Sequence, residues 1–115
     1  MLTVGSVVWG VRDVPRAVSF WSAALDYVPR DEPDDDWAVL VPRSGVGQQV
    51  AISLVGSDAG SHQRHHLDLY ASDQAAEVTR LRGLGATDVE WDYPDDADYV
   101  VLADPDGNRF CVVQK

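Results

Sequence analysis

An internal repeat is the feature that most constrains how this chain of 115 residues can fold. Two segments carry the same succession of a strand-like run, a helix-capping aspartate and a helical stripe of apolar residues. When the caps Asp13 and Asp73 are aligned, the segments are offset by 73 − 13 = 60 residues. A duplicated supersecondary unit accounts for this agreement. Apolar residues meet at the aligned pairs Val7 and Leu67, Trp9 and Leu69, Val11 and Ala71, Val18 and Val78, and Trp21 and Leu81.

The first copy predicts a strand, a helix and three further strands. Residues Val7 to Val11 are mostly β-branched or aromatic, which favours a buried strand. Asp13 can cap the next helix, and Pro15 suits its first turn because no N–H partner is needed there. The inward stripe of that helix is predicted as Val14, Val18, Trp21 and Leu25. The other strands are expected at Tyr27 to Arg30 (an edge strand, since it contains Pro29), Trp37 to Val41 and Gln49 to Val55.

The second copy repeats this order. Polar and apolar residues alternate from His66 to Ala71, which predicts a strand. Asp73 can cap a helix, and Gly85 is a natural stop for it. That helix is expected to turn Ala76, Val78, Leu81 and Leu84 inward. Three more strands are predicted at Val89 to Tyr93, Tyr99 to Ala103 and Arg109 to Val113, with a tight hairpin at Asp104-Pro105-Asp106-Gly107-Asn108 between the last two.

Length and composition predict a single α+β domain, with module one at about residues 1–57 and module two at about residues 64–115. An apolar fraction of 45% and a charged fraction of 24% are those of an ordinary globular protein. The single cysteine, Cys111, excludes an internal disulfide, and there is no CxxC pair to suggest a zinc site. The first residues have no basic region and are interrupted by Arg12 and Asp13, so we expect no membrane span and a cytoplasmic location.

The formal net charge of −10 narrows the choice of partner. It repels polyanions, and no basic stripe offsets it, so a nucleic acid is not expected as a partner. Acidic residues gather at 31–36 and at 95–98, and the simplest interpretation is two solvated loops. The alternative is that they rim a pocket and favour cationic or neutral ligands over anionic ones.

The order of these motifs resembles the glyoxalase/bleomycin-resistance/dioxygenase group, also called the vicinal oxygen chelate superfamily. The resemblance rests on the VRD segment before the first helix, on HLDL followed by SD, and above all on the terminal DPDGNRFCVV. It covers nearly the whole chain and implies two βαβββ modules whose curled mixed sheet surrounds a cup-shaped pocket, often in a homodimer. It does not imply one reaction, because the superfamily includes isomerases, lyases, dioxygenases and drug-sequestering proteins.

In metal-dependent members of that superfamily, four ligands line the cup, typically histidines on the first strands and glutamates on the last. The corresponding positions in this chain are Ser6, Ser53, His66 and Cys111. Two neutral hydroxyl groups are poor ligands for a divalent cation, and two remaining ligands rarely suffice. We therefore predict no metal cofactor, and keep a divalent metal at His66 and Cys111 as the alternative.

Strand alternation predicts which side chains share the pocket. If His66 points inward, Asp68 and Tyr70 do too, and Cys111 joins them from the last strand. His66 and Asp68 are then either a structural pair or a general acid–base pair. A nucleophilic role for Cys111 is the weaker alternative, because buried cysteines usually act as small hydrophobic groups. Trp9 and Trp21 are predicted in the core, whereas Trp37, Trp91, Tyr93 and Tyr99 are candidates for pocket walls; His62 and His65 are expected at the surface.

These observations favour a metal-independent protein that binds a small organic molecule through Ser6, Ser53, His66, Asp68, Tyr70, Cys111 and Trp37. The first alternative is a lyase, isomerase or dioxygenase that uses a divalent metal, or His66 and Asp68 as acid and base. A module that only mediates assembly is the third hypothesis. Nothing in the sequence names the ligand.

Overall fold

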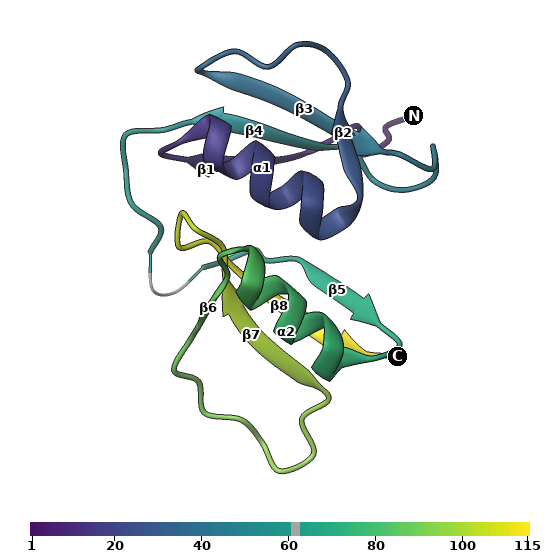
Figure 1. Cartoon of the computed structure of the whole chain (residues 1–115), viewed down its shortest axis with the longest axis vertical. Coiled ribbons are helices and arrows are strands. Elements are labelled where there is room, and N and C mark those ends of the chain that lie inside the picture. Colours follow the sequence, from purple (N-terminus) through teal and green to yellow (C-terminus); the bar gives the residue numbers. More distant parts are fainter. Residues whose placement is uncertain (61–62) are drawn as a thin grey trace. The chain divides into compact units, whose positions relative to one another are not determined.

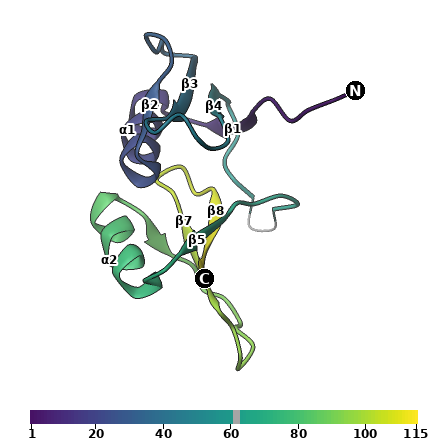
Figure 2. The same cartoon turned by 90° about the vertical axis from the view of Figure 1, so that its right-hand side faces the viewer.

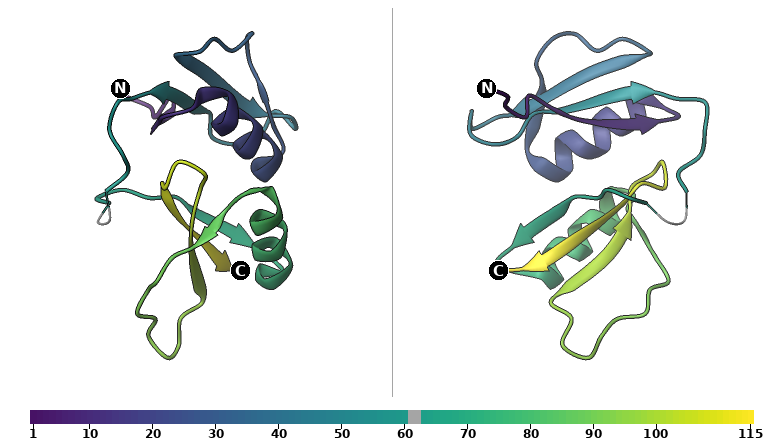
Figure 3. Two further views of the ribbon diagram at one scale, coloured as in Figure 1. Left: turned by 60° about the vertical axis from the view of Figure 1, so that its left-hand side comes forward. Right: turned by 180° about the vertical axis from the view of Figure 1, so that it is seen from behind.

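The computed structural model describes residues 1–60 and 63–115, which form two compact units. The first unit spans Met1–Asp58 and the second spans Ala59–Lys115 (Figure 1). In each unit one helix covers one face of a four-stranded sheet (Figures 1 and 3). His62, predicted at the surface, lies outside the described residues, whereas His65 is exposed as predicted.

The first unit has the predicted order of a strand, a helix and three strands. Its sheet runs β1-β4-β3-β2, with β1 and β4 parallel and the other pairs antiparallel. The edge position predicted for the strand that contains Pro29 is therefore confirmed. The elements are β1 (Val7–Val11), α1 (Val14–Leu25), β2 (Tyr27–Pro29), β3 (Trp37–Pro42) and β4 (Val50–Leu54).

The second unit repeats this topology. Its sheet runs β5-β8-β7-β6, again with one parallel pair, β5 and β8, and two antiparallel pairs. The elements are β5 (Asp68–Ala71), α2 (Gln74–Leu84), β6 (Thr87–Asp88), β7 (Tyr99–Ala103) and β8 (Arg109–Gln114).

The strand register confirms the predicted repeat. In the first unit Val8 of β1 pairs with Ala51 of β4, and in the second Asp68 of β5 pairs with Cys111 of β8. Both strands keep the same offset, since 68 − 8 and 111 − 51 are both 60. The predicted α+β fold of two βαβββ modules is thus confirmed. That the two units form a single domain stays a prediction.

Helix α1 begins where the sequence predicted but buries a different stripe. The Asp13 carboxylate accepts a hydrogen bond from the Arg16 N–H at 3.0 Å and so caps the helix. Val18 and Leu25, predicted to face inward, are only half-buried. Positions three and four residues apart share a helix face, and the buried set follows that spacing one residue away from the predicted line. The buried residues are Val14, Ala17, Phe20 and Trp21.

Helix α2 contacts its sheet through a narrower stripe than predicted. Asp73 caps it by accepting from the Ala76 N–H at 3.1 Å, and Gly85 ends it at φ +119°, a conformation that favours glycine. Val78 and Leu81 are buried, but Ala76 and Leu84 are exposed, so two of the four predicted inward positions are wrong. Neither described helix is long and apolar enough to cross a membrane.

The strand predicted at Val89 to Tyr93 is also wrong. The sheet has instead the two-residue strand β6, and residues 89–98 form a long connection to β7 that projects beyond the sheet (Figure 2). The reason lies at the edge of β7, where the Tyr93 hydroxyl accepts the Val101 N–H at 2.8 Å in place of a strand partner. The Tyr93 ring also lies 5.5 Å from the Tyr99 ring.

Candidate functional site

The second unit carries a hollow of about 360 Å³ on the sheet face opposite α2. Strands β5, β7 and β8 supply its floor, and the connection from β6 to β7 supplies a wall. Carboxylates, aromatic rings and one ammonium group surround a small apolar base. The lining residues are His66, Asp68, Tyr70, Trp91, Asp98, Tyr99, Cys111, Val113 and Lys115.

Strand alternation brings the central residues together. Asp68 and Tyr70 are exposed on β5, whereas Ala71 is buried and Leu69 half-buried against the other side of the sheet. On the neighbouring strand β8, Phe110 and Val112 are buried and Cys111 points to the hollow. His66 directly precedes β5 by two residues, so it lies on the same face. The sequence-predicted group of His66, Asp68, Tyr70 and Cys111 therefore lines one hollow.

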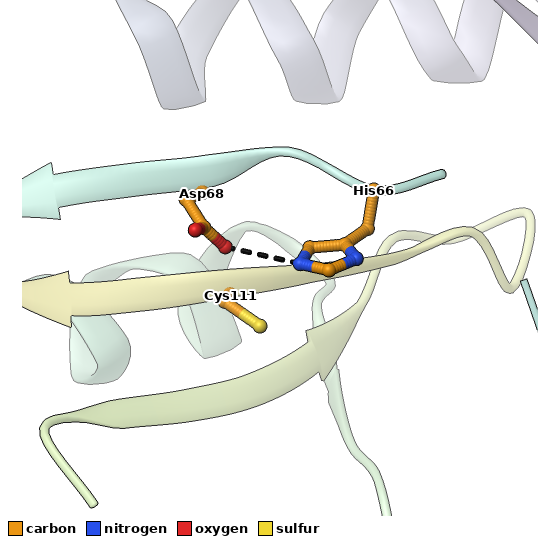
Figure 4. Close-up of side chains that lie close together, drawn as sticks. All are labelled: His66, Asp68 and Cys111. Carbon is orange, nitrogen blue, oxygen red and sulfur yellow. Dashed lines mark hydrogen bonds and ion pairs between the residues drawn. The ribbon is translucent and has the colours of Figure 1, made fainter. Parts of the chain in front are cut away.

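Asp68 lies between His66 and Cys111 in their network of contacts (Figure 4). The His66 Nε2 atom is 3.1 Å from Asp68 Oδ1, and each side chain is 50% exposed. Burial raises the pKa of the Cys111 thiol to about 11, and the negative charge of Asp68 and its hydrogen bond with the thiol raise it further. A thiol held protonated in this way is a poor nucleophile near neutral pH, which disfavours the nucleophilic role for Cys111.

We expect Cys111 to react slowly with iodoacetamide. At pH 8 a thiol of pKa about 11 is about a hundredfold less ionised than one at the ordinary value of 9.0. Alkylation of the folded protein should therefore be about a hundredfold slower than that of the urea-unfolded chain, and should accelerate about tenfold per pH unit up to pH 11. Asp68→Asn removes the carboxylate, so it should lower the thiol pKa and speed the reaction. A plateau reached below pH 9 in the unmodified protein would contradict the raised pKa.

The four ligand positions implied by the family resemblance do not fit a hard divalent cation. The register makes Ala51 the counterpart of Cys111, and Ser53 the counterpart of Val113. Ser6 and Ser53 are four rows apart along the sheet, because Val7 pairs with Val50 and Gly10 pairs with Ser53, a separation of about 13 Å. The first unit thus offers no carboxylate or imidazole at these positions.

The second unit alone brings three metal-binding side chains together. One donor atom each from His66, Asp68 and Cys111 lies within 4.8 Å of the others. A thiolate, an imidazole and a carboxylate form a softer donor set than the histidines and glutamates typical of the superfamily. A metal would also have to displace the thiol proton, so this cluster differs in composition and chemistry from the set that the resemblance implies.

The remaining predicted site residues lie on the first unit. Ser53 sits on β4 between Gly10 of β1 and Trp37 of β3. Trp37 is 43% exposed, and Ser6 is half-buried beside its own strand, with its hydroxyl 3.4 Å from the Val7 carbonyl oxygen. Trp9 and Trp21 are in the core as predicted, with ring centroids 4.6 Å apart.

Two charged residues of the hollow were not anticipated from the sequence. Asp98 precedes β7, and its carbonyl oxygen accepts the Gln114 N–H at 2.8 Å. Lys115 follows β8, where its N–H donates to the Ala71 carbonyl oxygen at 2.9 Å and its Nζ lies 5.3 Å from the centre of the Tyr70 ring. The only available signal was position, since each residue flanks a strand that was correctly predicted.

Comparison with known proteins places these features in a family. The family profile described as a glyoxalase-like domain matches residues 6–113. Comparison with curated proteins gives no match. A glyoxalase/bleomycin resistance protein/dioxygenase family enzyme from Burkholderia phytofirmans has a similar fold, with a TM-score of 0.76 at 15% identity over 98% of each chain.

Two further solved structures share the fold. A glyoxalase-related enzyme from Fulvimarina pelagi has a TM-score of 0.74 at 17% identity, covering 100% of this chain and 89% of its own. A member of the glyoxalase/bleomycin resistance protein/dioxygenase superfamily from Sphaerobacter thermophilus has a TM-score of 0.71 at 24% identity, covering 100% of this chain and 98% of its own. Since the profile spans nearly all of the two modules, the chain belongs to the glyoxalase-like domain family of the glyoxalase/bleomycin resistance protein/dioxygenase superfamily.

Proposed function

We propose that this protein binds a small organic molecule in the hollow of its second unit, without needing a metal. The observation that carries the proposal is the combination of aromatic walls with a polar floor in one open cavity of about 360 Å³. Ligand pockets in proteins are typically of about 300–1,000 Å³, mostly apolar, with a few polar groups that fix orientation. Here Tyr70, Trp91 and Tyr99 supply contact area, and His66, Asp68 and Cys111 supply hydrogen-bonding groups.

The polar floor suits recognition by hydrogen bonding. The Asp68 carboxylate can accept from a ligand hydroxyl or amine, and it also orients the His66 ring through their 3.1 Å contact. The protonated Cys111 thiol adds a weak donor at the base. The family contains drug-sequestering proteins as well as enzymes, which is consistent with binding as the primary activity.

Tryptophan fluorescence provides the test of this proposal. Trp91 lines the hollow and is 45% exposed, so a bound molecule should change its emission. In a screen of a broad compound library, we expect at least one saturable change, and we expect Trp91→Phe to abolish it. Trp37→Phe tests the sequence-based prediction that the first unit also contributes through Trp37, Ser6 and Ser53. A screen in which no compound produces a saturable response would contradict the proposal.

The second candidate function is an enzyme, and the cluster of His66, Asp68 and Cys111 is the observation that favours it. The cluster could hold a metal that polarises a substrate oxygen, or His66 and Asp68 could exchange a proton with the substrate directly. Metal analysis of protein purified without a histidine tag separates the candidates. Near-stoichiometric iron, zinc, nickel or manganese would favour the enzyme, and a metal-dependent turnover lost in His66→Ala would establish it.

The proposal includes a homodimer that acts in the cytoplasm. Both are expectations from the family resemblance and the sequence. Sedimentation velocity tests the first, because a dimer has a mass of 2 × 12.6 = 25.2 kDa. Cell fractionation with the endogenous chain tests the second.

A further inference from the structure

We propose that the hollow of the second unit selects an organic cation, and that Lys115 occupies the cation position when no ligand is bound. This inference rests on the proposed function and names the class of ligand. It is argued from the rings that line the hollow, from its charges, and from the contact that Lys115 makes.

The rings of the hollow are available to a ligand. Tyr70 is 71% exposed, and Trp91 and Tyr99 stand at other positions on the same wall and floor. The face of an aromatic ring attracts a cation placed within about 6 Å of its centre, and it attracts an anion on that face far less favourably. A quaternary or protonated amine can therefore use surface that a carboxylate or phosphate cannot.

The charges of the hollow favour the same class of ligand. Two carboxylates, Asp68 and Asp98, line it together with a single ammonium group, that of Lys115. The adjoining connection from β6 to β7 adds Asp92, Asp95 and Asp96. With a formal net charge of −10 on the whole chain, the local and the overall fields both attract cations and repel anions.

Lys115 shows that a cation fits against the ring. Its Nζ atom lies 5.3 Å from the centre of the Tyr70 ring, within the distance of a cation–π contact. The backbone of Lys115 is fixed by its hydrogen bond to Ala71, which places the side chain beside the hollow. An incoming cation would displace the ammonium group to solvent, so Lys115 acts as a tethered competitor for the position over Tyr70.

A pair of probes of equal shape isolates the charge. Choline and 3,3-dimethylbutan-1-ol differ chiefly in that a quaternary nitrogen replaces a carbon. We expect choline to bind about tenfold more tightly, a preference within the range of cation–π contacts. Tyr70→Leu should remove the preference, whereas Tyr27→Leu, which alters a tyrosine of the first unit, should leave it unchanged.

The displacement of Lys115 can be observed directly, because it is the only lysine of the chain. Reductive methylation with ¹³C-formaldehyde keeps its positive charge and labels it for NMR; any labelled α-amino group is distinguished by its lower pKa. In the free protein we expect the Lys115 methyl resonance to be shifted by the Tyr70 ring. Choline should move it to the position seen in Tyr70→Leu, and Lys115→Gln should tighten choline binding about threefold.

The outcomes separate this inference from the proposed function. If neutral compounds bind in the hollow and choline is not preferred, or if choline binds without moving the Lys115 resonance, the inference is overturned and the proposed function stands. If neither choline, its neutral analogue nor any compound of the broad library binds, both are overturned.

Discussion

Phe110→Ala should lower the free energy of unfolding by about 3–5 kcal/mol, the usual cost of truncating a fully buried phenylalanine. Phe110 is 0% exposed and lies on β8, which has β5 on one side and β7 on the other. Its removal would leave a cavity directly beneath the strand that carries Cys111. Urea denaturation followed by circular dichroism measures the loss, and we expect ligand binding in the hollow to weaken with it.

The matched control is Val46→Ala, which shortens an exposed side chain and should change stability by less than about 0.5 kcal/mol. Hydrogen exchange on Phe110→Ala also tests whether the chain is a single domain. Each unit holds fewer than 60 residues, a size at which an isolated domain is marginal. We expect amides of both units to lose protection together; loss confined to the second unit would contradict a single domain.

The repeat made the fold predictable from the sequence. Alternation along β5 and β8, a cap at the start of each helix and a glycine after α2 are local signals, and the offset of 60 residues tied them together. The side chains that share the hollow followed from alternation as well, because a period of two leaves one choice of face once His66 is placed.

The errors arose where tertiary contacts outweigh local pattern. Residues 89–93 have the composition of a strand, but a single hydroxyl, that of Tyr93, satisfies the edge of β7 in its place. Ala76 and Leu84 of α2 fit an inward stripe, yet the helix meets its sheet mainly through Val78 and Leu81. Such outcomes depend on the angle between helix and sheet, which the helical period does not encode.

The position of the fourth family ligand shows another limit of sequence alignment. Ser53 was chosen because the loop after it obscures where β4 ends, and only the pairing of β1 with β4 identifies Ala51 as the counterpart of Cys111. The place of Lys115 over Tyr70 depends on the twist and register of β8 and β5 together. Neither relation is visible in a single strand.

Asp104→Ala should cost about 3 kcal/mol, because it leaves two backbone N–H groups of the β7–β8 hairpin without their acceptor. Asp104 is only 2% exposed. Its Oδ1 atom accepts from the N–H of Asp106 at 3.0 Å and from that of Asn108 at 2.8 Å. The hairpin sets the register of β8, so the substitution should also loosen the strand that presents Cys111 to the hollow.

The variant Asp104→Asn keeps a carbonyl oxygen that can accept these two bonds but removes the negative charge. We expect it to lose about half as much stability, because charge-assisted hydrogen bonds are roughly twice as strong as neutral ones. Asp95→Asn, in the exposed connection before β7, is the control for charge alone and should change stability by less than about 0.5 kcal/mol. Urea denaturation of the three variants gives the ranking. If Asp104→Ala proved as stable as Asp95→Asn, the buried carboxylate would not be what holds the hairpin, and the register of β8 would have to depend on its pairing with β5 and β7 alone.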